Sequence, residues 1–348
     1  MVSFLKNRFC YFAVSALSLT TAHGASDSSM NSSPIERPRA LPPSLYGHAG
    51  DPAVLASAAY TYWTAREDNL LVSYSNFNVL SENTNQGFSS YPTWNTFSGF
   101  KVALGTILPH DAWELCAEFT YFVANRPFTN HNILPNGTIS TWSLDLPLNS
   151  ISSQWNNWLY RGDIDLRYTF FVGNYLSLTT LGGLASVFGD QTFNITQSPF
   201  ESDTFENSTS GTIHATQWAW GIGPHLGFES DFAFYGTSQN QFSFFFQGGG
   251  SILLSQYQTT QQWTSTSADA DFLLNRVTLY ADTPLLETMF GLRWHTFIDG
   301  RDAASFLVEL GWEEQVILGY NYLTATISSI PPGNYYMYGL TLRAQIGF

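Results

Sequence analysis

The last eleven residues of the chain, Tyr338 to Phe348, alternate strictly between apolar side chains and small or polar ones. Successive side chains of a β-strand point to opposite faces, so this segment has one apolar face and one polar face. A tilted strand of about nine to eleven residues is also long enough to cross a lipid bilayer. The segment therefore predicts a strand with lipid or core on one side and, on the other, surroundings that accept the guanidinium of Arg343.

About ten segments of the chain have this strand character. The first could divide at Glu67-Asp68, and the sequence leaves eight or twelve strands open. Pro224 falls inside one of them and removes a ladder donor, which predicts a bulge or kink there. Gly248-Gly249-Gly250 weakens another strand, unless these glycines serve curvature or close packing inside the fold. The predicted strands are 57–74, 97–107, 112–124, 157–171, 175–188, 214–234, 241–257, 284–297, 304–317 and 337–348.

The connections between these strands are alternately short and long. Long structureless loops are uncommon in a compact soluble domain, whereas outer-membrane barrels have short periplasmic turns and long extracellular loops. An even number of strands also places both ends of the barrel on the periplasmic side. The pattern predicts an all-β, transmembrane, antiparallel up-and-down β-barrel. The short connections are 109–111, 172–174, 235–240 and 299–301, and the long ones are 75–96, 125–156, 189–213, 258–283 and 318–336.

Composition favours a membrane barrel over a soluble domain. Charged residues make up 11% of the chain and aromatic residues 16%, whereas a soluble domain averages about 25% charged residues. No internal run approaches the roughly 18 apolar residues that indicate a membrane helix. The net charge of −14 argues against nucleic acid as a partner.

The first residues have the pattern of an export signal. Two basic residues precede an apolar run, and Ala22-His23-Gly24 provides small residues at the spacing of a cleavage site. We expect a signal peptide over 1–24, a flexible periplasmic segment rich in Ser, Asn and Pro over 25–56, and the barrel over 57–348. Cys116 would then be the single cysteine of the mature chain, which leaves no internal disulfide.

The polar faces of the predicted strands carry acids and bases together. In strand 157–171, Trp158 and Tyr160 lie on one face while Arg161 and Asp163 lie on the other. An Arg or Lys at the lipid-facing midplane costs about 2–4 kcal/mol, so we expect the charged faces to point into a lumen, where opposite charges can pair. We predict that the following residues line it: Arg66, Lys101, Glu114, Glu118, Arg161, Asp163, Asp165, Arg167, Glu287, Arg293, Glu309 and Arg343.

Several segments resemble one protein family. They are SGFKVALGTILPHDAWELCAEFTYF (98–122), WAWGIGPHLGFESDFAF (218–234), MFGLRWHTF (289–297), ELGWEEQVIL (309–318) and the terminal YGLTLRAQIGF. These segments are similar to the chlamydial major-outer-membrane-protein-like family, which is shared with pore-forming outer-membrane proteins of legionellae. The resemblance implies a signal peptide, an outer-membrane barrel and pore formation. The chain departs from the best-known chlamydial members, which are cross-linked through disulfides, because Cys116 stands alone.

The end of the chain also resembles the terminal signal of bacterial outer-membrane barrels, which stops on an aromatic residue. This likeness implies a location in the bacterial outer membrane, with membrane lipid and the barrel-assembly machinery as partners. The residues that would form the assembly signal are Tyr338, Leu340, Leu342, Ile346 and Phe348.

No motif of a known catalytic site is present. The sequence lacks Gly-x-Ser-x-Gly, His-Glu-x-x-His, Cys-x-x-Cys and a glycine-rich phosphate loop. We therefore predict no enzyme activity, no cofactor and no metal. His225 and Glu229 share one strand face, where they could ligate a metal or form lumen hydrogen bonds. A rim protease is an alternative, and its candidate residues are His214, Asp203, Asp269 and Asp271.

These observations predict a passive pore for ions and small solutes. Acids and bases mix along the predicted lining, so selectivity between cations and anions should be weak. About eight strands leave an interior filled by side chains and 16–18 leave an aqueous channel, so ten strands predict a narrow lumen. The alternatives are a closed structural or adhesive barrel that acts through its long extracellular loops, and a soluble β-sandwich. The sequence leaves homo-oligomerisation open.

Overall fold

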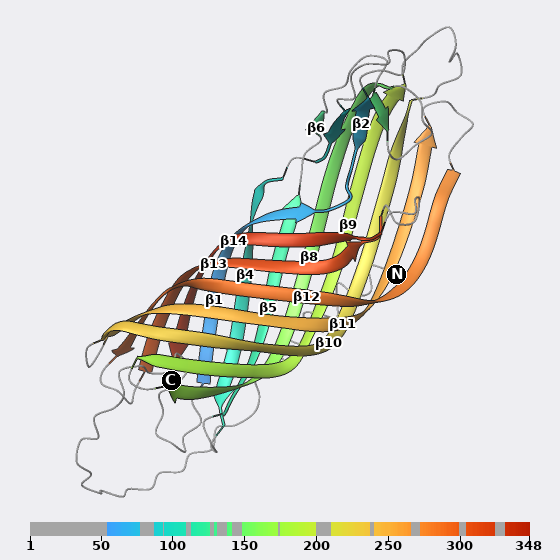
Figure 1. The fold of residues 1–348 in the computed structure, drawn as a ribbon. Coiled ribbons are helices and arrows are strands. Elements are labelled where there is room, and N and C mark those ends of the chain that lie inside the picture. Colours follow the sequence, from blue (N-terminus) through green and yellow to red (C-terminus); the bar gives the residue numbers. More distant parts are fainter. Residues whose placement is uncertain are drawn as a thin grey trace, which may run out of the picture. The chain divides into compact units, whose positions relative to one another are not determined.

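Long antiparallel strands dominate the computed structural model of the protein (Figure 1). The structure describes residues 54–76, 87–92, 94–108, 113–125, 129–130, 138–140, 148–172, 175–199, 210–236, 240–265, 272–298, 304–323 and 331–348. The long strands are β1 (Val54–Glu67), β4 (Thr96–Ile107), β5 (Trp113–Asn125), β8 (Leu148–Val172), β9 (Leu176–Pro199), β10 (Gly211–Gly236), β11 (Asn240–Ser265), β12 (Phe272–Ile298), β13 (Ala304–Asn321) and β14 (Gly333–Gly347).

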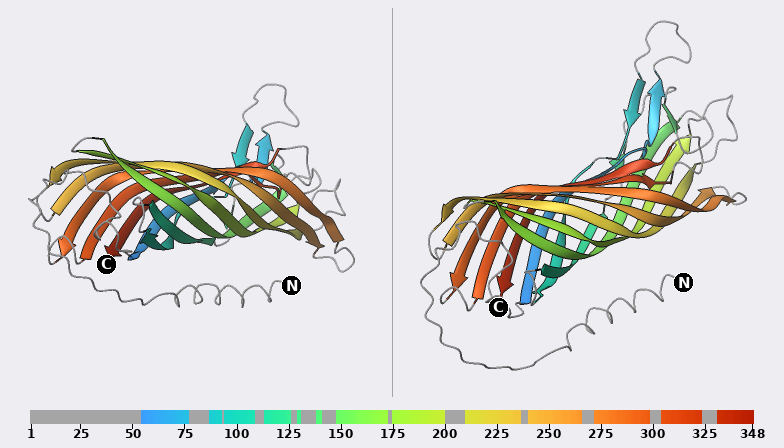
Figure 2. Two further views of the ribbon diagram at one scale, coloured as in Figure 1. Left: turned by 90° about the horizontal axis from the view of Figure 1, so that it is seen from below. Right: turned by 60° about the horizontal axis from the view of Figure 1, so that its bottom comes forward.

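These ten strands form a closed ring. Its order is β5, β4, β1, β14, β13, β12, β11, β10, β9 and β8, and β5 pairs with β8 to complete it. Each strand is antiparallel to its neighbours, and β1 pairs with β14 from Leu55 opposite Gly347 to Glu67 opposite Tyr335. Figure 2 shows the strands in two further views. The prediction of an all-β, up-and-down barrel of about ten strands is confirmed.

Short and long connections alternate over most of the ring, but the predicted long connection 258–283 is wrong, because β11 continues to Ser265 and β12 begins at Phe272. β8 ends at Val172 and β9 begins at Leu176, whereas β9 ends at Pro199 and β10 begins only at Gly211. Residues 1–53 lie outside the described residues, so the division into signal peptide and periplasmic segment stays a prediction. The last three residues of the predicted periplasmic segment, 54–56, instead belong to β1.

Strands β8 to β12 run farther toward the long connections than the sequence indicated. Gln, Asn and Thr occupy most outward positions of these extensions. Because such residues are also common in loops, the sequence alone did not distinguish strand from loop there.

The first predicted strand, 57–74, divides after Glu67, at the position where the sequence left a division open. β1 stops at Glu67, and Asn69 adopts a left-handed backbone with φ of 65°. The chain then enters a separate small sheet. That sheet contains β2 (Ser73–Asn76), β3 (Gly87–Ser90) and β7 (Thr138–Ser140), and the short β6 (Thr129–Asn130) pairs with β8.

The outer face of the ring carries a band of exposed apolar side chains. Leu226 is 70% exposed and Leu254 is 67% exposed. Outward-facing charges at Arg66, Asp282 and Glu314 mark the edge of this band on the side of the long connections. Such a band is what a bilayer covers, so the membrane-spanning part of each strand lies between this edge and the short connections. Among the described residues, no helix is long and apolar enough to span a membrane.

Pro224 does not produce the predicted bulge. The register between β10 and β11 is the same on both sides of it, and the irregularity in this ladder falls between Ala233 and Tyr235. The pairing with β11 skips Gly223 and Pro224. A gap in the ladder therefore accommodates the missing proline donor without an extra residue in the strand.

Candidate functional site in the barrel lumen

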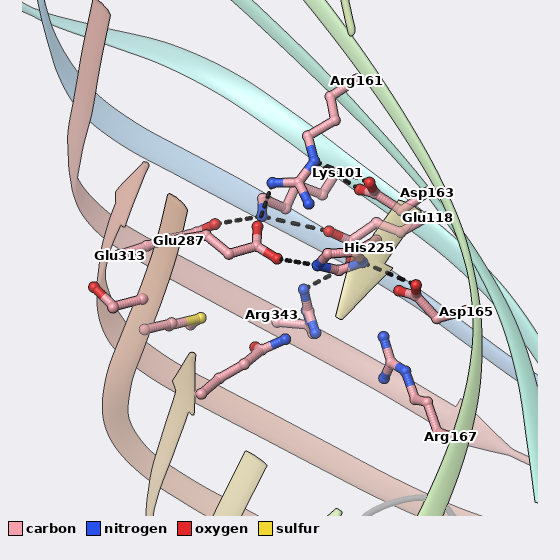
Figure 3. A pocket seen from close by; sticks show the side chains of 13 residues that line it. Lys101, Glu118, Arg161, Asp163, Asp165, Arg167, His225, Glu287, Glu313 and Arg343 are labelled. Carbon is pink, nitrogen blue, oxygen red and sulfur yellow. Dashed lines mark hydrogen bonds and ion pairs between the residues drawn. The ribbon is translucent and has the colours of Figure 1, made fainter. Parts of the chain in front are cut away.

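Charged side chains of the membrane-spanning strands converge in the lumen. Every second residue of a strand points inward, which brings Arg161, Asp163 and Asp165 of β8 to one face, all of them buried. Arg293 and Glu309 of β12 and β13 are buried on the same inner surface. We call the inward-facing charged side chains of the membrane-spanning strands the charged layer, and Figure 3 shows the part of it around Arg161, Asp163 and Asp165.

Ion pairs of the charged layer join strands that are not neighbours in the ring. Lys101 of β4 contacts Glu313 of β13, with 2.5 Å between Nζ and Oε1, although β1 and β14 lie between the two strands. Arg161 of β8 forms an ion pair with Glu287 of β12, with three strands between them on one side of the ring. The dashed lines in Figure 3 mark these contacts. Such pairs cross the lumen and tie its walls together.

Arg293 is the centre of a second group of ion pairs. Its Nη2 lies 2.7 Å from Glu229 Oε1 and 2.5 Å from Glu309 Oε1, and its Nη1 pairs with Asp231. The guanidinium also lies 4.8 Å from the centre of the Phe245 ring. One buried cation thus serves three carboxylates from β10 and β13.

His225 lies between two carboxylates from different strands. Its Nδ1 is 2.9 Å from Asp165 Oδ1, and its Nε2 is 2.8 Å from Glu287 Oε1. Gly249 makes room for this pair, because a Cβ there would lie 2.9 Å from Glu287 Oε1 and 3.1 Å from His225 Nε2. The predicted role of Gly249 in close packing is therefore the one observed. Glu229 instead contacts Arg293, so His225 and Glu229 do not come together as a metal pair.

Of the predicted lining residues, only Arg66 faces outward. Its side chain is 55% exposed and pairs with Asp68 at 3.5 Å, so its assignment to the lumen was wrong. Both faces of β1 are largely apolar, with Trp63 inside and Tyr62 outside, so the alternation did not show which face was inner. The residues that do face inward are Lys101, Glu114, Glu118, Arg161, Asp163, Asp165, Arg167, Glu287, Arg293, Glu309 and Arg343. That these residues line a conducting path stays a prediction.

Little space remains among these charges. A cavity of about 30 Å³ lies between side chains that include Lys101, Arg161, Arg167 and Arg343. A site of this size holds roughly two water molecules. In the part of the chain that the structure describes, no group of three or more His, Cys, Asp or Glu side chains is placed to hold a metal ion.

An aromatic layer fills the lumen on the extracellular side of the charged layer. Its rings meet across the barrel: Trp155 of β8 and Tyr335 of β14 have centroids 6.2 Å apart, and Tyr257 of β11 and Tyr320 of β13 are 6.0 Å apart. Gly189 of β9 provides space for the Tyr320 hydroxyl, which a Cβ would meet at 1.8 Å. We call this layer the aromatic septum. Its largest buried members are Trp63, Phe122, Trp155, Tyr257, Tyr320 and Tyr335.

Polar side chains tie the aromatic septum together. Gln191 of β9 donates from Nε2 to Glu67 Oε1 of β1 at 3.0 Å and accepts from Trp155 Nε1 at 3.2 Å. Gln217 of β10 donates to the carbonyl oxygen of Tyr320 at 2.8 Å. These hydrogen bonds join non-neighbouring strands, as the ion pairs of the charged layer do.

Glu67 is a fully buried acid at the edge of this septum. It follows Arg66 at the end of β1, beyond the apolar band, and is 1% exposed. Burial raises the pKa of the Glu67 carboxyl to about 8, and hydrogen bonds from Gln191 and Trp155 lower it only in part. The carboxyl group is therefore largely protonated at pH 7.

The septum was not foreseen from the sequence. Tyr320 and Tyr335 fall in the predicted long loop 318–336, and Gln191 falls in the predicted loop 189–213. The alternation of Gln191, Phe193 and Ile195 with polar residues is the signal that could have extended the strand. In the charged layer, Asp231 and Glu313 were also missing from the predicted lining.

The rim-protease alternative gains little from the structure. His214 is exposed on β10, and its Nδ1 lies 2.5 Å from Asn194 Oδ1. The other three candidates, Asp203, Asp269 and Asp271, lie outside the described residues.

The residues of the predicted assembly signal lie on the outer face of β14. Leu340 is 48% exposed and Leu342 is 49% exposed, and Phe348 is 64% exposed just after the strand. Their recognition by assembly machinery stays a prediction.

A protein-family model matches residues 55–347, which cover every strand of the ring almost completely. That family is described as the Legionella pneumophila major outer membrane protein precursor. The chain belongs to this family. It is an outer-membrane β-barrel protein, and the bacterial outer membrane is its location.

Among solved structures, the chain is similar to several outer-membrane proteins at low identity. The outer membrane protease OmpT of Escherichia coli is 10% identical over 85% of this chain and 96% of its own, with a TM-score of 0.43. A major outer membrane protein of Thermus thermophilus is 11% identical over 86% and 100%, with a TM-score of 0.31. The Pseudomonas putida toluene transporter TodX is 9% identical over 86% and 89%, with a TM-score of 0.23. No curated protein matches the chain.

Proposed function

We propose that this family member is a closed outer-membrane barrel with a structural role at the cell surface, acting through the part that extends beyond the membrane. The observation that carries this proposal is that side chains of non-neighbouring strands meet inside the barrel at two levels. Ion pairs such as Arg161 with Glu287 cross the charged layer, and ring contacts such as Trp155 with Tyr335 cross the septum.

A passive pore needs a continuous column of water, and the septum opposes one. Trp63, Trp155 and Tyr335 are each 1% exposed or less, so water has almost no contact with them. Moving an unpaired charge into an apolar layer is costly, because the layer cannot replace its hydration. Ions would therefore meet a high barrier at the septum even where the charged layer could accommodate them.

The extensions of β8 to β12 support a surface role. They continue the barrel wall past the apolar band, and their outward positions carry residues such as Asn156, Thr192, Thr216 and Thr260. A paired β-wall of uncharged polar residues is a rigid support for the long extracellular connections. A closed lumen suits this role, because contacts inside the barrel would stabilise it while binding would take place on its outer surface.

Planar-bilayer recording tests the proposal. Purified protein should give no discrete conductance steps at neutral pH over a range of voltages and salts. The double substitution Trp155→Ala with Tyr335→Ala should produce steps, because it removes a ring contact that spans the septum. The matched control is Tyr338→Ala, on the outward face of the same strand as Tyr335, which should stay silent. If wild-type protein gave conductance steps as large as those of the double variant, the proposal would be refuted.

The second candidate is a low-conductance pore for ions and small solutes. The mixed charges of the lumen favour it, because a lumen lined by both Glu118 and Arg343 suits ions of either sign. In this case the septum would open during transport. A wild-type conductance whose weak ion preference shifts in Glu118→Gln would support the pore over the closed barrel.

We further propose that the protein has no catalytic role and needs no cofactor. Its partners would be outer-membrane lipid and, during biogenesis, the barrel-assembly machinery through the outward residues of β14.

A further inference from the structure

Glu67 joins two distant parts of the barrel wall. It ends β1, whereas its hydrogen-bond partner Gln191 belongs to β9, and strands β4, β5 and β8 lie between them on the shorter side of the ring. Gln191 is itself held by Trp155. Both side chains are buried: Gln191 is 0% exposed and Trp155 is 1% exposed. The geometry of Gln191 is therefore fixed, with its amide nitrogen directed at Glu67.

Among the residues that the structure describes, no cation compensates Glu67. Within the described residues, no Lys, Arg or His side chain lies within ion-pair distance of its carboxyl group. Arg66 points to the outside and pairs with Asp68. Asp68 in turn accepts a hydrogen bond from the Tyr336 hydroxyl at 3.0 Å, on the exposed side of β14.

The other ionisable groups near Glu67 cannot supply positive charge either. Tyr335 lies directly opposite Glu67 on β14, and Tyr320 of β13 packs on Tyr335 with ring centroids 5.4 Å apart. Asp190 precedes Gln191 on β9 and is an acid, and Trp155 of β8 does not titrate. Burial, together with the nearby Glu67, raises the pKa of both tyrosines well above its ordinary value. The ionisable groups near Glu67 in the described part of the chain are thus neutral or acidic.

The hydrogen-bonding pattern suits a protonated carboxyl group. Gln191 donates to Oε1, while Oε2 and the hydroxyl oxygens of Tyr320 and Tyr335 are buried without a hydrogen-bond partner among the described residues. A carboxylate in this layer would be strongly destabilised, because the nearby donors Gln191 and Trp155 offset its burial only in part and no described cation pairs with it. A neutral carboxyl group avoids that cost and keeps the link to Gln191.

We propose that Glu67 is a proton-operated latch of the aromatic septum. Protonated Glu67 holds β1 against β9 through Gln191, and loss of the proton places a charge inside the septum and loosens it. The latch rests on the closed lumen proposed above and adds a means by which external pH controls it.

The direction in which pH changes the stability of the barrel follows from the raised pKa of the Glu67 carboxyl group. An unfolded chain releases this proton near pH 4.5, whereas the folded barrel keeps it up to about pH 8. The contribution of Glu67 to stability is therefore present in full below pH 4.5 and declines as pH rises from there to about 8.

Thermal unfolding, followed by the difference in gel mobility between folded and boiled barrel, tests the latch. The midpoint temperature of wild-type protein should fall by several degrees between pH 5 and pH 9. Glu67→Gln should remove most of this fall, because the amide cannot ionise. The matched control is Asp68→Asn, which neutralises the neighbouring acid on the outside and should keep the wild-type fall. Equal pH dependence of wild-type and Glu67→Gln would overturn the latch.

Infrared spectroscopy provides a measurement that does not depend on unfolding. Wild-type protein should show a carbonyl stretch of a buried protonated carboxyl group at pH 6 that is lost by pH 9.5, and Glu67→Gln should lack it. Absence of the band from wild-type protein would overturn the latch whatever the unfolding result. Conductance of wild-type protein at pH 6 would instead refute the closed barrel. The pH dependence of unfolding and the infrared band of Glu67 could still be interpreted in that case.

Discussion

Replacing Arg293 by Met should destabilise the barrel more than any other single loss of a cation from the lumen. Arg293 is buried and pairs with Glu229, Asp231 and Glu309. Methionine retains much of the apolar stem, so packing against Phe245 should change little. What the substitution removes is the one guanidinium that these three carboxylates share.

The magnitude follows from what is left behind. Removing one partner of a buried ion pair typically costs about 3–5 kcal/mol, because the remaining charge is buried without compensation. Glu229 and Asp231 lose the guanidinium they pair with, and Glu309 keeps only the longer contact with Arg343 at 3.8 Å, so we expect a loss at the upper end of this range. Protonation of one or more of them would relieve the repulsion, so the loss should shrink as pH is lowered from 7 to 4.

Urea unfolding of protein refolded into lipid vesicles measures the effect. Arg66→Met is the matched control, since the same substitution removes an exposed pair worth about 0–1 kcal/mol. The expected result is a large fall in the urea midpoint for Arg293→Met and almost none for Arg66→Met. If the two variants lost equal stability, the ion pairs around Arg293 would not be the support that the structure indicates.

Gly249→Val should lower the free energy of unfolding by about 1–3 kcal/mol in the same urea assay, because the new side chain would be overpacked against His225 and Glu287. Gly236→Val should be tolerated better, because a Cβ at Gly236 meets no atom closer than 3.9 Å. The Cys116 thiol, which is buried, should resist a membrane-impermeant maleimide in folded protein and react after unfolding; rapid labelling of the folded barrel would indicate a water-filled lumen. Phe348→Ser should reduce the fraction of protein assembled in the outer membrane, measured by heat-modifiable migration, and an unchanged fraction would remove Phe348 from the assembly signal.

The barrel itself could be predicted because alternation within strands and alternation between connections point to the same fold. Leu340 and Leu342 face outward as their spacing requires, and charges such as Arg161 and Asp163 face inward. The membrane-spanning strands obey a simple rule, since one face meets lipid and the other does not. Arg66 escaped the rule because β1 is apolar on both faces.

The septum could not be predicted by the same rule. Beyond the apolar band, the outer face meets water and the inner face is apolar, so the polarity of the two faces is reversed. Trp155 and Phe193 point inward there, while Asn156 and Thr192 point outward. The contacts that close the lumen, such as Gln191 with Glu67, also join residues far apart in the sequence. Only the register of the complete ring brings them together.

The seam between the first and last strands of the ring has a consequence for biogenesis. Val54 and Phe348 exchange two backbone hydrogen bonds, of 2.8 and 3.0 Å, at the base of that seam. Loop-closure entropy makes so distant a pairing slow to find. The earlier strands must therefore wait, with their edges unpaired, until β14 arrives. During that interval the nascent chain is prone to aggregate, so chaperones that protect its unpaired edges should raise its yield.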